Sequence, residues 1–238
     1  MGLTEDLLAL YDGLRVTDIC DGLDAIGLID TCTMDWQIRP LWRDTEALTH
    51  RIYGIAHTVR FVPTSRIVPR PMELEDYKTW KRRWYRDLAP GPKEPIAAGE
   101  IIVIDAAEVA DVGFIGSNNA QGWINAGARG VVTNGGCRDT DELIRQKVPV
   151  YSRRIARGIR PGRLEWDAEN IPIGCGGVRV FPGDVVVADG DGVIVVPRGH
   201  AEVVARIARD IANEDKASRR ERFREAGMED DFTVAPLH

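Results

Sequence analysis

The sequence contains few cysteines and no C-x-x-C pair. Its four cysteines are scattered through 238 residues, a pattern typical of free thiols in a reducing compartment and not of a disulfide framework. Basic residues are not in excess either, because the formal net charge is -6. A nucleic-acid-binding domain normally shows a basic balance or a basic stripe, so we expect no nucleic-acid partner.

Long apolar runs are missing too. No stretch approaches the roughly 18 apolar residues that a membrane span requires, and the first residues, Met1 to Asp6, have no basic segment of the kind that begins a signal peptide. We therefore expect a soluble cytoplasmic protein with no membrane partner. The length is ample for a sizeable core in one large domain or two small ones.

The most informative stretch runs from Gly130 to Glu142. Its apolar start is typical of a buried strand, and the pair Gly135-Gly136 indicates an unusual turn or a close backbone approach. Arg138 and Asp139 come next, and Thr140 is a typical residue at the start of a helix. The guanidinium and the carboxylate are thus predicted between the carboxyl end of a strand and a helix N-terminus, where open α/β sheets place ligand chemistry.

A second polar segment, Gly116-Ser-Asn-Asn119, is predicted to lead into a helix with Ser117 as its cap. Backbone N–H groups at such a loop point the same way and suit a carboxylate or a phosphate. The spacing matches neither G-x-G-x-x-G nor the Walker pattern, so it does not support a nucleotide site. An ordinary capped helix is the alternative.

Periodicity predicts the remaining elements. Helices are expected over 4–14, 17–26, 76–86, 117–128, 141–147 and 200–227, strands over 38–40, 54–61, 99–105 and 148–151, a hairpin within 182–197, and an arginine-rich loop over 153–170. The strand at 148–151 begins with a proline and is expected at a sheet edge. His57 alternates with apolar neighbours and is interpreted as a satisfied, half-buried histidine rather than a ligand.

Two features leave alternatives open. Trp80 and Trp84 lie on one face of a basic helix, which either packs its tryptophans on a neighbour or contacts phosphates or RNA. Asp189-Gly-Asp-Gly192 lies between two apolar runs, so a hairpin turn is favoured over a cation site.

Four phrases, taken together, resemble the RraA-like family, which includes the 4-hydroxy-4-methyl-2-oxoglutarate/4-carboxy-4-hydroxy-2-oxoadipate aldolases. They are Gly130-Val-Val-Thr-Asn-Gly-Gly-Cys-Arg-Asp139, Val148-Pro-Val-Tyr151, Ile173-Gly-Cys-Gly-Gly-Val178 and the segment Pro182 to Pro197. The resemblance implies a layered α/β sandwich of the swivelling β/β/α type. It further implies one domain over 1–238, with an insertion around 70–92 and a C-terminal helix over 200–227.

The resemblance also implies a site. Arg138 matches an arginine that holds the carboxylate and keto oxygen of a pyruvate unit, and Asp139 matches an aspartate that binds Mg²⁺ or Mn²⁺. Asp21 and Glu214 match acidic residues near the pocket, the second from a neighbouring subunit. The loop residues Gly116, Ser117, Asn118 and Asn119 would contact the substrate. The assembly implied is a homotrimer or homohexamer with sites between subunits.

One departure from the family pattern bears on activity. The aldolases carry an acid directly after the loop glycine, where this sequence has Ser117. The function expected first is a metal-dependent lyase on a small 2-oxo acid, by pyruvate-releasing aldol cleavage or oxaloacetate-type decarboxylation. Alternatives are a lyase or dehydratase for a related sugar acid, and a non-enzymatic regulator that binds an RNA-degrading endonuclease.

Overall fold

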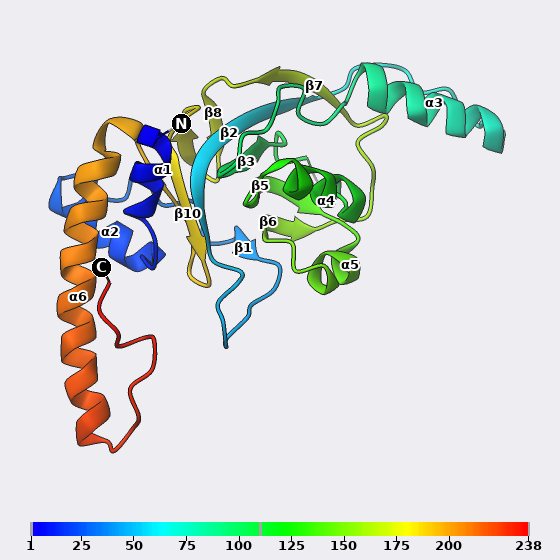
Figure 1. Ribbon diagram of the computed structural model, residues 1–238. Helices are drawn as coiled ribbons and strands as arrows, with labels where there is room; N and C mark the ends of the chain where they lie inside the picture. Colours follow the sequence, from blue (N-terminus) through cyan, green and yellow to red (C-terminus); the bar gives the residue numbers. More distant parts are fainter. Residues whose placement is uncertain (1, 110, 238) are drawn as a thin grey trace.

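The computed structural model describes residues 2–109 and 111–237, and its body is one strongly curved, nine-stranded sheet with helices packed on its outer face at both ends (Figure 1). The strand order is β1-β6-β5-β3-β2-β10-β11, with β4 beside β5 and β7 beside β2. The strands of this sheet are β1 (Arg39–Pro40), β2 (Ile52–Pro63), β3 (Glu100–Asp105), β4 (Gly113–Ile115), β5 (Gly130–Cys137), β6 (Val150–Ile155), β7 (Leu164–Glu169), β10 (Val185–Asp189) and β11 (Gly192–Val196). Strands β2, β3, β5 and β6 run parallel to their neighbours in that order.

The central strands are buried on both faces, which explains their continuous apolar runs. Successive residues of β3 alternate between two cores: Ile102 and Ile104 face one side, whereas Ile101 and Val103 face the other. The first side is covered by α4 (Ser117–Ala126) and α5 (Thr140–Arg145) (Figure 1). The second side is enclosed by the curl of the sheet and by the hairpin of β8 (Ile173–Cys175) and β9 (Val178–Val180).

A third core lies on the outer face of β10 and β11. It is covered by α1 (Gly2–Ala9), α2 (Val16–Ala25) and α6 (Ala201–Glu225), the last entered through a 3₁₀ turn (Arg198–His200). Helices α2 and α6 approach closely at Gly22, where an added Cβ would lie 2.9 Å from the carbonyl oxygen of Val204. The small residue is therefore required by the contact between the helices.

Helix α3 (Leu74–Asp87) projects from the body on the α4 side (Figure 1). Its C-terminal half is anchored: Trp84 is buried, and its Nε1 donates to the carbonyl oxygen of Leu164 at 3.0 Å. Trp80 stacks beside Trp84 with ring centroids 5.4 Å apart and packs on the same core. The prediction that these tryptophans pack is confirmed.

His57 joins the segment after α3 to the sheet. Its Nδ1 lies 3.0 Å from a carboxylate oxygen of Glu100, and its Nε2 lies 2.6 Å from one of Glu169. Glu169 also accepts the backbone N–H groups of Lys93 and Glu94. The prediction of a satisfied histidine is confirmed, although the ring is fully buried rather than half-buried.

Other predictions are confirmed or corrected by the sheet. The hairpin within 182–197 is β10 and β11, turning at the pair Asp189 and Gly192. The loop predicted over 153–170 is wrong, because β7 pairs with the far half of β2 beyond the end of β10 and fills that edge. The strand at 148–151 is not at the edge, since the two-residue β1 covers β6. The helix expected to reach residue 14 ends at Ala9 and continues as turns.

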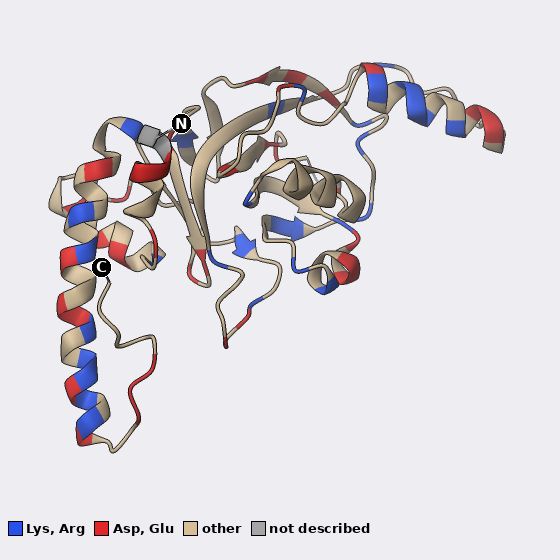
Figure 2. Cartoon of the chain, viewed as in Figure 1, with Lys and Arg blue, Asp and Glu red and all other residues tan. Residues whose placement is uncertain are grey.

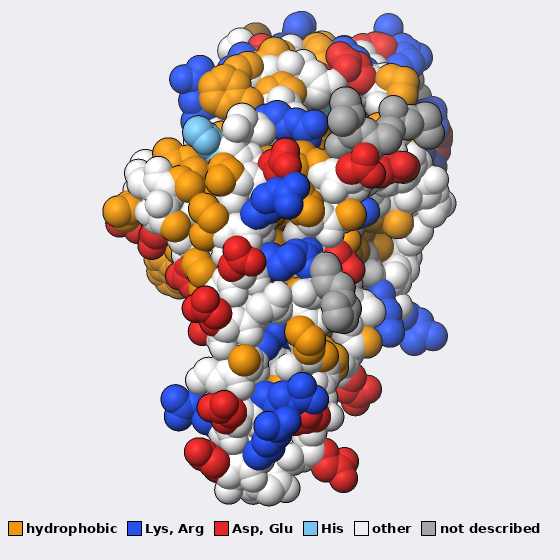
Figure 3. All heavy atoms as spheres, turned by 60° about the vertical axis from the view of Figure 1, so that its left-hand side comes forward, with side chains coloured by type: hydrophobic (Ala, Val, Ile, Leu, Met, Phe, Trp, Pro, Cys, Tyr) orange, Lys and Arg blue, Asp and Glu red, His pale blue; other side chains and the backbone are white. Residues whose placement is uncertain are grey.

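Charged side chains concentrate on the far half of α6 and along α3 (Figure 2), and the lower part of the molecule carries few apolar side chains on the face turned forward in Figure 3. All four cysteines are free thiols. Within residues 2–109 and 111–237, no helix combines the length and the hydropathy that crossing a membrane would require.

Replacing Gly22 by alanine tests the contact between α2 and α6. Gly22→Ala should lower the free energy of unfolding by roughly 1–3 kcal/mol, because overpacking at a backbone contact forces the helices apart. Gly122→Ala is the matched control, since Gly122 is exposed on helix α4 and nothing lies within 4 Å of its added Cβ. That control should gain about 0.5–1 kcal/mol. Urea denaturation measures both, and equal effects would contradict the packing argument.

Candidate functional site

The carboxyl ends of β4 and β5 lie side by side and carry the predicted site. The strands pair in parallel, with Gly113 opposite Gly136 and Ile115 opposite Cys137. The backbone N–H of Arg138 donates to the carbonyl oxygen of Ile115 at 2.7 Å. Arg138 and Asp139 therefore leave β5 where Gly116 leaves β4, as predicted from the strand, glycine turn and helix signals.

The two turns are in close contact. An added Cβ would lie 2.7 Å from the Cβ of Arg138 if it were on Gly113, and 2.8 Å from Oδ2 of Asp139 if it were on Gly116. Asp139 has a left-handed backbone, with φ 55° and ψ 43°, and its carbonyl oxygen accepts the N–H of Leu143 in the first turn of α5. Both turns are thus held in one conformation.

The pair Arg138 and Asp139 is a half-exposed ion pair. Nε of Arg138 lies 3.1 Å from Oδ1 of Asp139, and each side chain is 34% exposed. Oδ2 of Asp139 accepts the N–H of Ser117 at 3.3 Å, which satisfies a donor at the start of α4. The prediction that Ser117 caps this helix is wrong: Gly116 has the cap position, and Ser117 is the first helical residue.

A cavity of about 510 Å³ opens over these turns. Three of the loop residues predicted to bind substrate, Gly116, Asn118 and Asn119, line it together with Arg138 and Asp139. It is also lined by Lys81 and Tyr85 of α3, the turn Pro90-Gly91, and Ile159-Arg160. Lys81, Arg138 and Arg160 face a single carboxylate, Asp139, so the cavity is suited to an anion.

Arg160 is the most unusual residue of the cavity. Its side chain is buried, only 3% exposed, and its Nε has no partner among the described residues. Nη1 donates to the carbonyl oxygen of Pro90 at 2.8 Å, and the guanidinium lies over the rings of Phe114, Tyr85 and Phe61. No carboxylate among those residues neutralises it, and burial lowers the pKa of Arg160 to about 10. Burying a cation without a counterion is costly, and the three aromatic rings offset part of that cost.

The sequence did not single out Lys81, Tyr85 or Arg160 as site residues. Arg160 is one of five arginines between 153 and 163, and nothing local distinguishes the buried one from the exposed ones. Lys81 and Tyr85 reach the cavity only because Trp84 anchors α3 beside β7.

Asp21 and Glu214 lie elsewhere in the chain. Both are exposed, on α2 and α6, and neither lines the cavity beside Arg138. These helices pack on the outer face of β10 and β11, at the other end of the curved sheet from α4 and α5 (Figure 1). Partial burial, together with the neighbouring carboxylates of Asp18 and Asp215, raises the pKa of Asp21. Within one chain, the predicted acids and the predicted arginine form no common site.

The donor set fits a weakly bound hard cation better than a tightly chelated one. Among the described residues, no group of three or more His, Cys, Asp and Glu side chains converges, which does not suit zinc. Mg²⁺ needs only one or two carboxylates, because it keeps several waters. Asp139 supplies one carboxylate, and Asn118 and Asn119 in the same wall have amide oxygens of the type that completes such a shell.

One family model matches most of the chain. The model described as RraA-like, Aldolase/RraA, matches residues 16–195. The chain belongs to the RraA-like family. A relative from Thermus thermophilus named 4-hydroxy-4-methyl-2-oxoglutarate aldolase is 31% identical over 105 residues, which are 44% of this chain and 63% of that protein. The chain spans 58–64% of the length of the first curated relatives it matches.

Solved structures share the RraA-like fold across nearly the whole chain. An uncharacterised protein from Pseudomonas syringae pv. tomato superposes with a TM-score of 0.72 at 24% identity, covering 94% of both chains. RraAS2 of Streptomyces coelicolor, described as an unusual member of the RNase ES inhibitor RraA protein family, gives 0.68 at 24% identity, covering 90% of this chain and 96% of its own. The expected α/β class and RraA-like fold are confirmed.

Replacing Arg160 by methionine distinguishes a ligand-binding arginine from a structural one. Arg160→Met should change the free energy of unfolding by less than about 1 kcal/mol, because removing an unneutralised buried charge offsets the loss of its hydrogen bond to Pro90 and of its contacts with Tyr85 and the two phenylalanine rings. The matched comparison is Arg153→Met, which breaks ion pairs to Asp35 and Glu108 at 2.5 and 2.9 Å and should cost roughly 1.5–3 kcal/mol. Urea unfolding measures both variants. A loss at Arg160 larger than the loss at Arg153 would show that the guanidinium holds the fold together.

Proposed function

We propose that this protein is a lyase that acts on a small 2-oxo acid and releases pyruvate. The observation that carries the proposal is the fork of Arg138 at the carboxyl end of β5, open to an electropositive cavity and backed by the N-terminus of α4. The name of the Thermus thermophilus relative supports the same reaction class.

Arg138 is free to bind the substrate. Only its Nε contacts Asp139, and no described residue accepts a hydrogen bond from its Nη groups. A guanidinium presents parallel donors that match a carboxylate, so Arg138 would hold the 1-carboxylate and the 2-oxo oxygen of the substrate. The backbone N–H groups at the start of α4 add donors on the same side.

Bond cleavage then requires a stabilised enolate. In aldol cleavage the 4-hydroxyl loses its proton and becomes a carbonyl while the C3–C4 bond breaks, and the electron pair moves through C3 to the 2-oxo oxygen. The enolate gains a proton at C3 and leaves as pyruvate. Decarboxylation of a 4-carboxylate gives the same enolate without a base. Arg138 contributes most when the negative charge moves onto the oxygen it contacts.

A divalent cation, Mg²⁺ or Mn²⁺, belongs to this proposal. Asp139 would hold it, and its chemistry there is that of a Lewis acid beside the 2-oxo oxygen. Ser117 stands where the aldolases carry an acid, and Asp139 is the one carboxylate in the cavity wall among the residues that the structure describes.

Arg160 and Lys81 favour a substrate with a second negative group. They line the same cavity as Arg138 and Asp139. A 2-oxo acid with a further carboxylate would neutralise the buried guanidinium of Arg160. A sugar acid without a second charge, the alternative substrate class, would leave it unpaired. The regulator alternative gives no account of a buried cation inside a cavity.

A second copy of the chain would complete the site. Asp21 and Glu214 are too far from Arg138 to serve it within one chain, so they act in this reaction only if another subunit brings them. A homotrimer or homohexamer, with sites between subunits, supplies that arrangement. One of the two carboxylates would then take the proton of the 4-hydroxyl.

Substitutions at Arg138 and Asp139 should have different kinetic effects. Arg138→Ala should raise KM, lower kcat, and reduce kcat/KM about 10- to 150-fold, the equivalent of a charge-assisted hydrogen bond worth roughly 1.5–3 kcal/mol. Asp139→Ala should weaken cation affinity, so added Mg²⁺ or Mn²⁺ restores part of its activity and none of that of Arg138→Ala. Pyruvate release from 4-hydroxy-4-methyl-2-oxoglutarate and from oxaloacetate provides the assay. Normal turnover per folded molecule in both variants would show that Arg138 and Asp139 form a structural ion pair with no role in catalysis.

Mixing inactive subunits tests the shared site. If Glu214 of one chain serves Arg138 of another, Arg138→Ala refolded together with Glu214→Gln should recover activity at about a quarter of the sites under random mixing. Arg138→Ala mixed with Asp139→Ala is the control and should recover nothing, because both residues belong to one cavity. Light scattering reports the assembly. No recovery in an assembled mixture would exclude Glu214 as a partner of Arg138 across subunits.

A further inference from the structure

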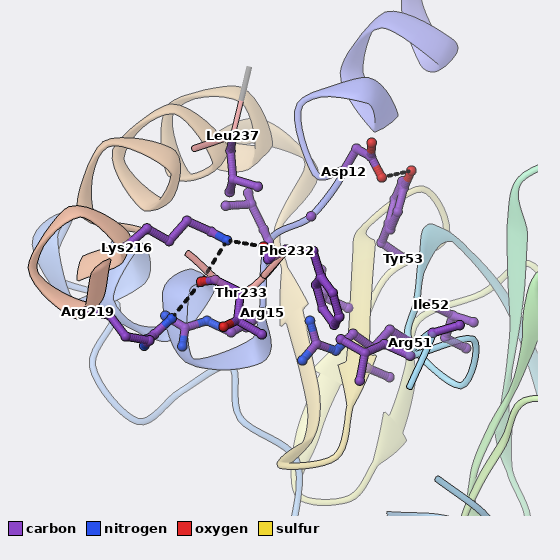
Figure 4. A pocket seen from close by; sticks show the side chains of 16 residues that line it. Asp12, Arg15, Arg51, Ile52, Tyr53, Lys216, Arg219, Phe232, Thr233 and Leu237 are labelled. Atoms are coloured by element: carbon purple, nitrogen blue, oxygen red, sulfur yellow. Dashed lines mark hydrogen bonds between the residues drawn. The ribbon is translucent and has the colours of Figure 1, made fainter. Parts of the chain in front are cut away.

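A second cavity, of about 580 Å³, lies between α6 and the sheet, on the side away from Arg138. Its walls are the turn before α2, the loop before β2 with the first residues of β2, strand β10, α6 and the last residues of the chain (Figure 4). Apolar side chains such as Leu14, Ile52 and Phe232 line part of it. The volume falls within the range of small-molecule sites, roughly 300–1,000 Å³.

Four cations surround this cavity, from three separate segments. Lys216 and Arg219 extend from α6, Arg15 from the residue before α2, and Arg51 from the facing loop, with their charged ends turned toward the same hollow (Figure 4). Asp12 is the one acidic side chain in the wall, and it accepts from the hydroxyl of Tyr53 at 3.2 Å. The wall is therefore strongly electropositive.

Three of the four cations have no ion-pair partner within the described part of the chain. Arg15 pairs with Asp18 and with Asp215. Lys216 and Arg219 donate to the carbonyl oxygens of Phe232 and Thr233, at 3.0–3.2 Å. Hydrogen bonds from Thr233, together with the charges of Lys216 and Arg219, lower the pKa of Asp231, the residue before Phe232. Arg51 has no side-chain hydrogen bond to a described residue. Burial, with repulsion from Arg15 and Arg219, lowers the pKa of Lys216. Like charges brought together in this way favour an anion between them.

The cavity wall is preformed rather than loose. The chain after α6 turns back along the helix (Figure 1), where Asn213 exchanges two hydrogen bonds with the backbone of Leu237 at 2.7 and 3.1 Å. Val234 is buried, and Arg220 pairs with Asp230. These contacts fix Phe232 and Thr233 against Lys216 and Arg219.

The site is also separate from the proposed reaction. Lys216 and Glu214 are two residues apart on α6, hence about 200° apart around the helix, so the cavity and the carboxylate face different directions. The cavity shares no residue with the one that Arg138 lines.

We propose that this second cavity binds a small organic anion, with a carboxylate or phosphate head held by Lys216, Arg219 and Arg51 and an apolar body against Ile52 and Phe232. Arg15 is already paired, so it adds to the positive electrostatic potential of the cavity without a direct contact to the ligand. The head accounts for the uncompensated cations, and the body accounts for the apolar part of the wall. The proposal stands whether or not the protein is a lyase.

Phenyl phosphate is the probe, and isothermal titration calorimetry with the full chain gives its affinity. Binding to the wild type is expected, and it should weaken on raising the salt to about 0.5 M because the contact is electrostatic. Benzyl alcohol, with a similar body and no charge, should not bind, and inorganic phosphate should bind more weakly. Phenylacetate shows whether a carboxylate head serves as well.

Charge-removing variants locate the binding. Arg51→Gln should weaken binding about tenfold without unfolding, because its side chain makes no contact that the fold needs. Lys216→Gln should do the same and still donate to the carbonyl oxygen of Thr233. Arg222→Gln, on the exposed side of the same helix, is the matched control and should bind normally. Arg138→Ala should also bind normally.

Three results would overturn the proposal. Equal affinity of wild type, Arg51→Gln and Lys216→Gln for phenyl phosphate would show that these two cations do not bind it. Loss of binding in Arg138→Ala would show that phenyl phosphate binds in the cavity beside Arg138. A change in the number of chains per particle in Arg51→Gln or Lys216→Gln, seen by light scattering without any phenyl phosphate binding to wild type, would make the cavity a contact between copies.

Discussion

The parallel pairing of β4 with β5 is the constraint on which the site depends. It brings two strand ends into contact at Gly113 and Gly116, where no side chain fits between the turns. Once the strands pair in this register, the guanidinium of Arg138 and the carboxylate of Asp139 have one place to lie, beside the start of α4. The left-handed backbone of Asp139 is an unfavourable conformation, and the packing of the two turns holds it in place. Position, rather than an unusual residue type, makes the pair a candidate for chemistry.

Sequence patterns predicted the parts of this arrangement that are local. Strand, glycine turn, charged pair and helix follow one another from Gly130 to Glu142, so the placement of Arg138 and Asp139 could be inferred without knowing the fold. The hairpin of β10 and β11 was equally readable, because Asp189 to Gly192 combines a turn with two apolar runs. Strand β7 was missed, since its residues become a strand only by pairing with β2. The identity of Arg160 as a buried residue depends on aromatic rings from three distant segments and had no local signal.

Charge distribution connects stability with ligand binding in this fold. His57 lies between two carboxylates, and Arg153 between two others. Arg160 is buried without such a partner, and Lys216, Arg219 and Arg51 around the second cavity also lack an ion pair to a described residue. An unneutralised cation lowers the stability of the free protein and raises its affinity for anions. A cation that lacks a counterion in the free protein is therefore a candidate contact for an anionic ligand.

Helix α3 has a consequence for how this protein could diversify. The helix is rooted at Trp84, and the segment that carries it returns to the sheet at the carboxylates beside His57. It contributes Lys81 and Tyr85 to one wall of the cavity, while Arg138 and Asp139 belong to the sheet. Exchange of residues 64–98 for another loop would therefore change the part of the cavity wall on which Arg160 rests, without replacing Arg138 or Asp139. Substrate selectivity and reactivity would then depend on two different parts of the chain, the segment 64–98 and the ends of β4 and β5, which could change separately.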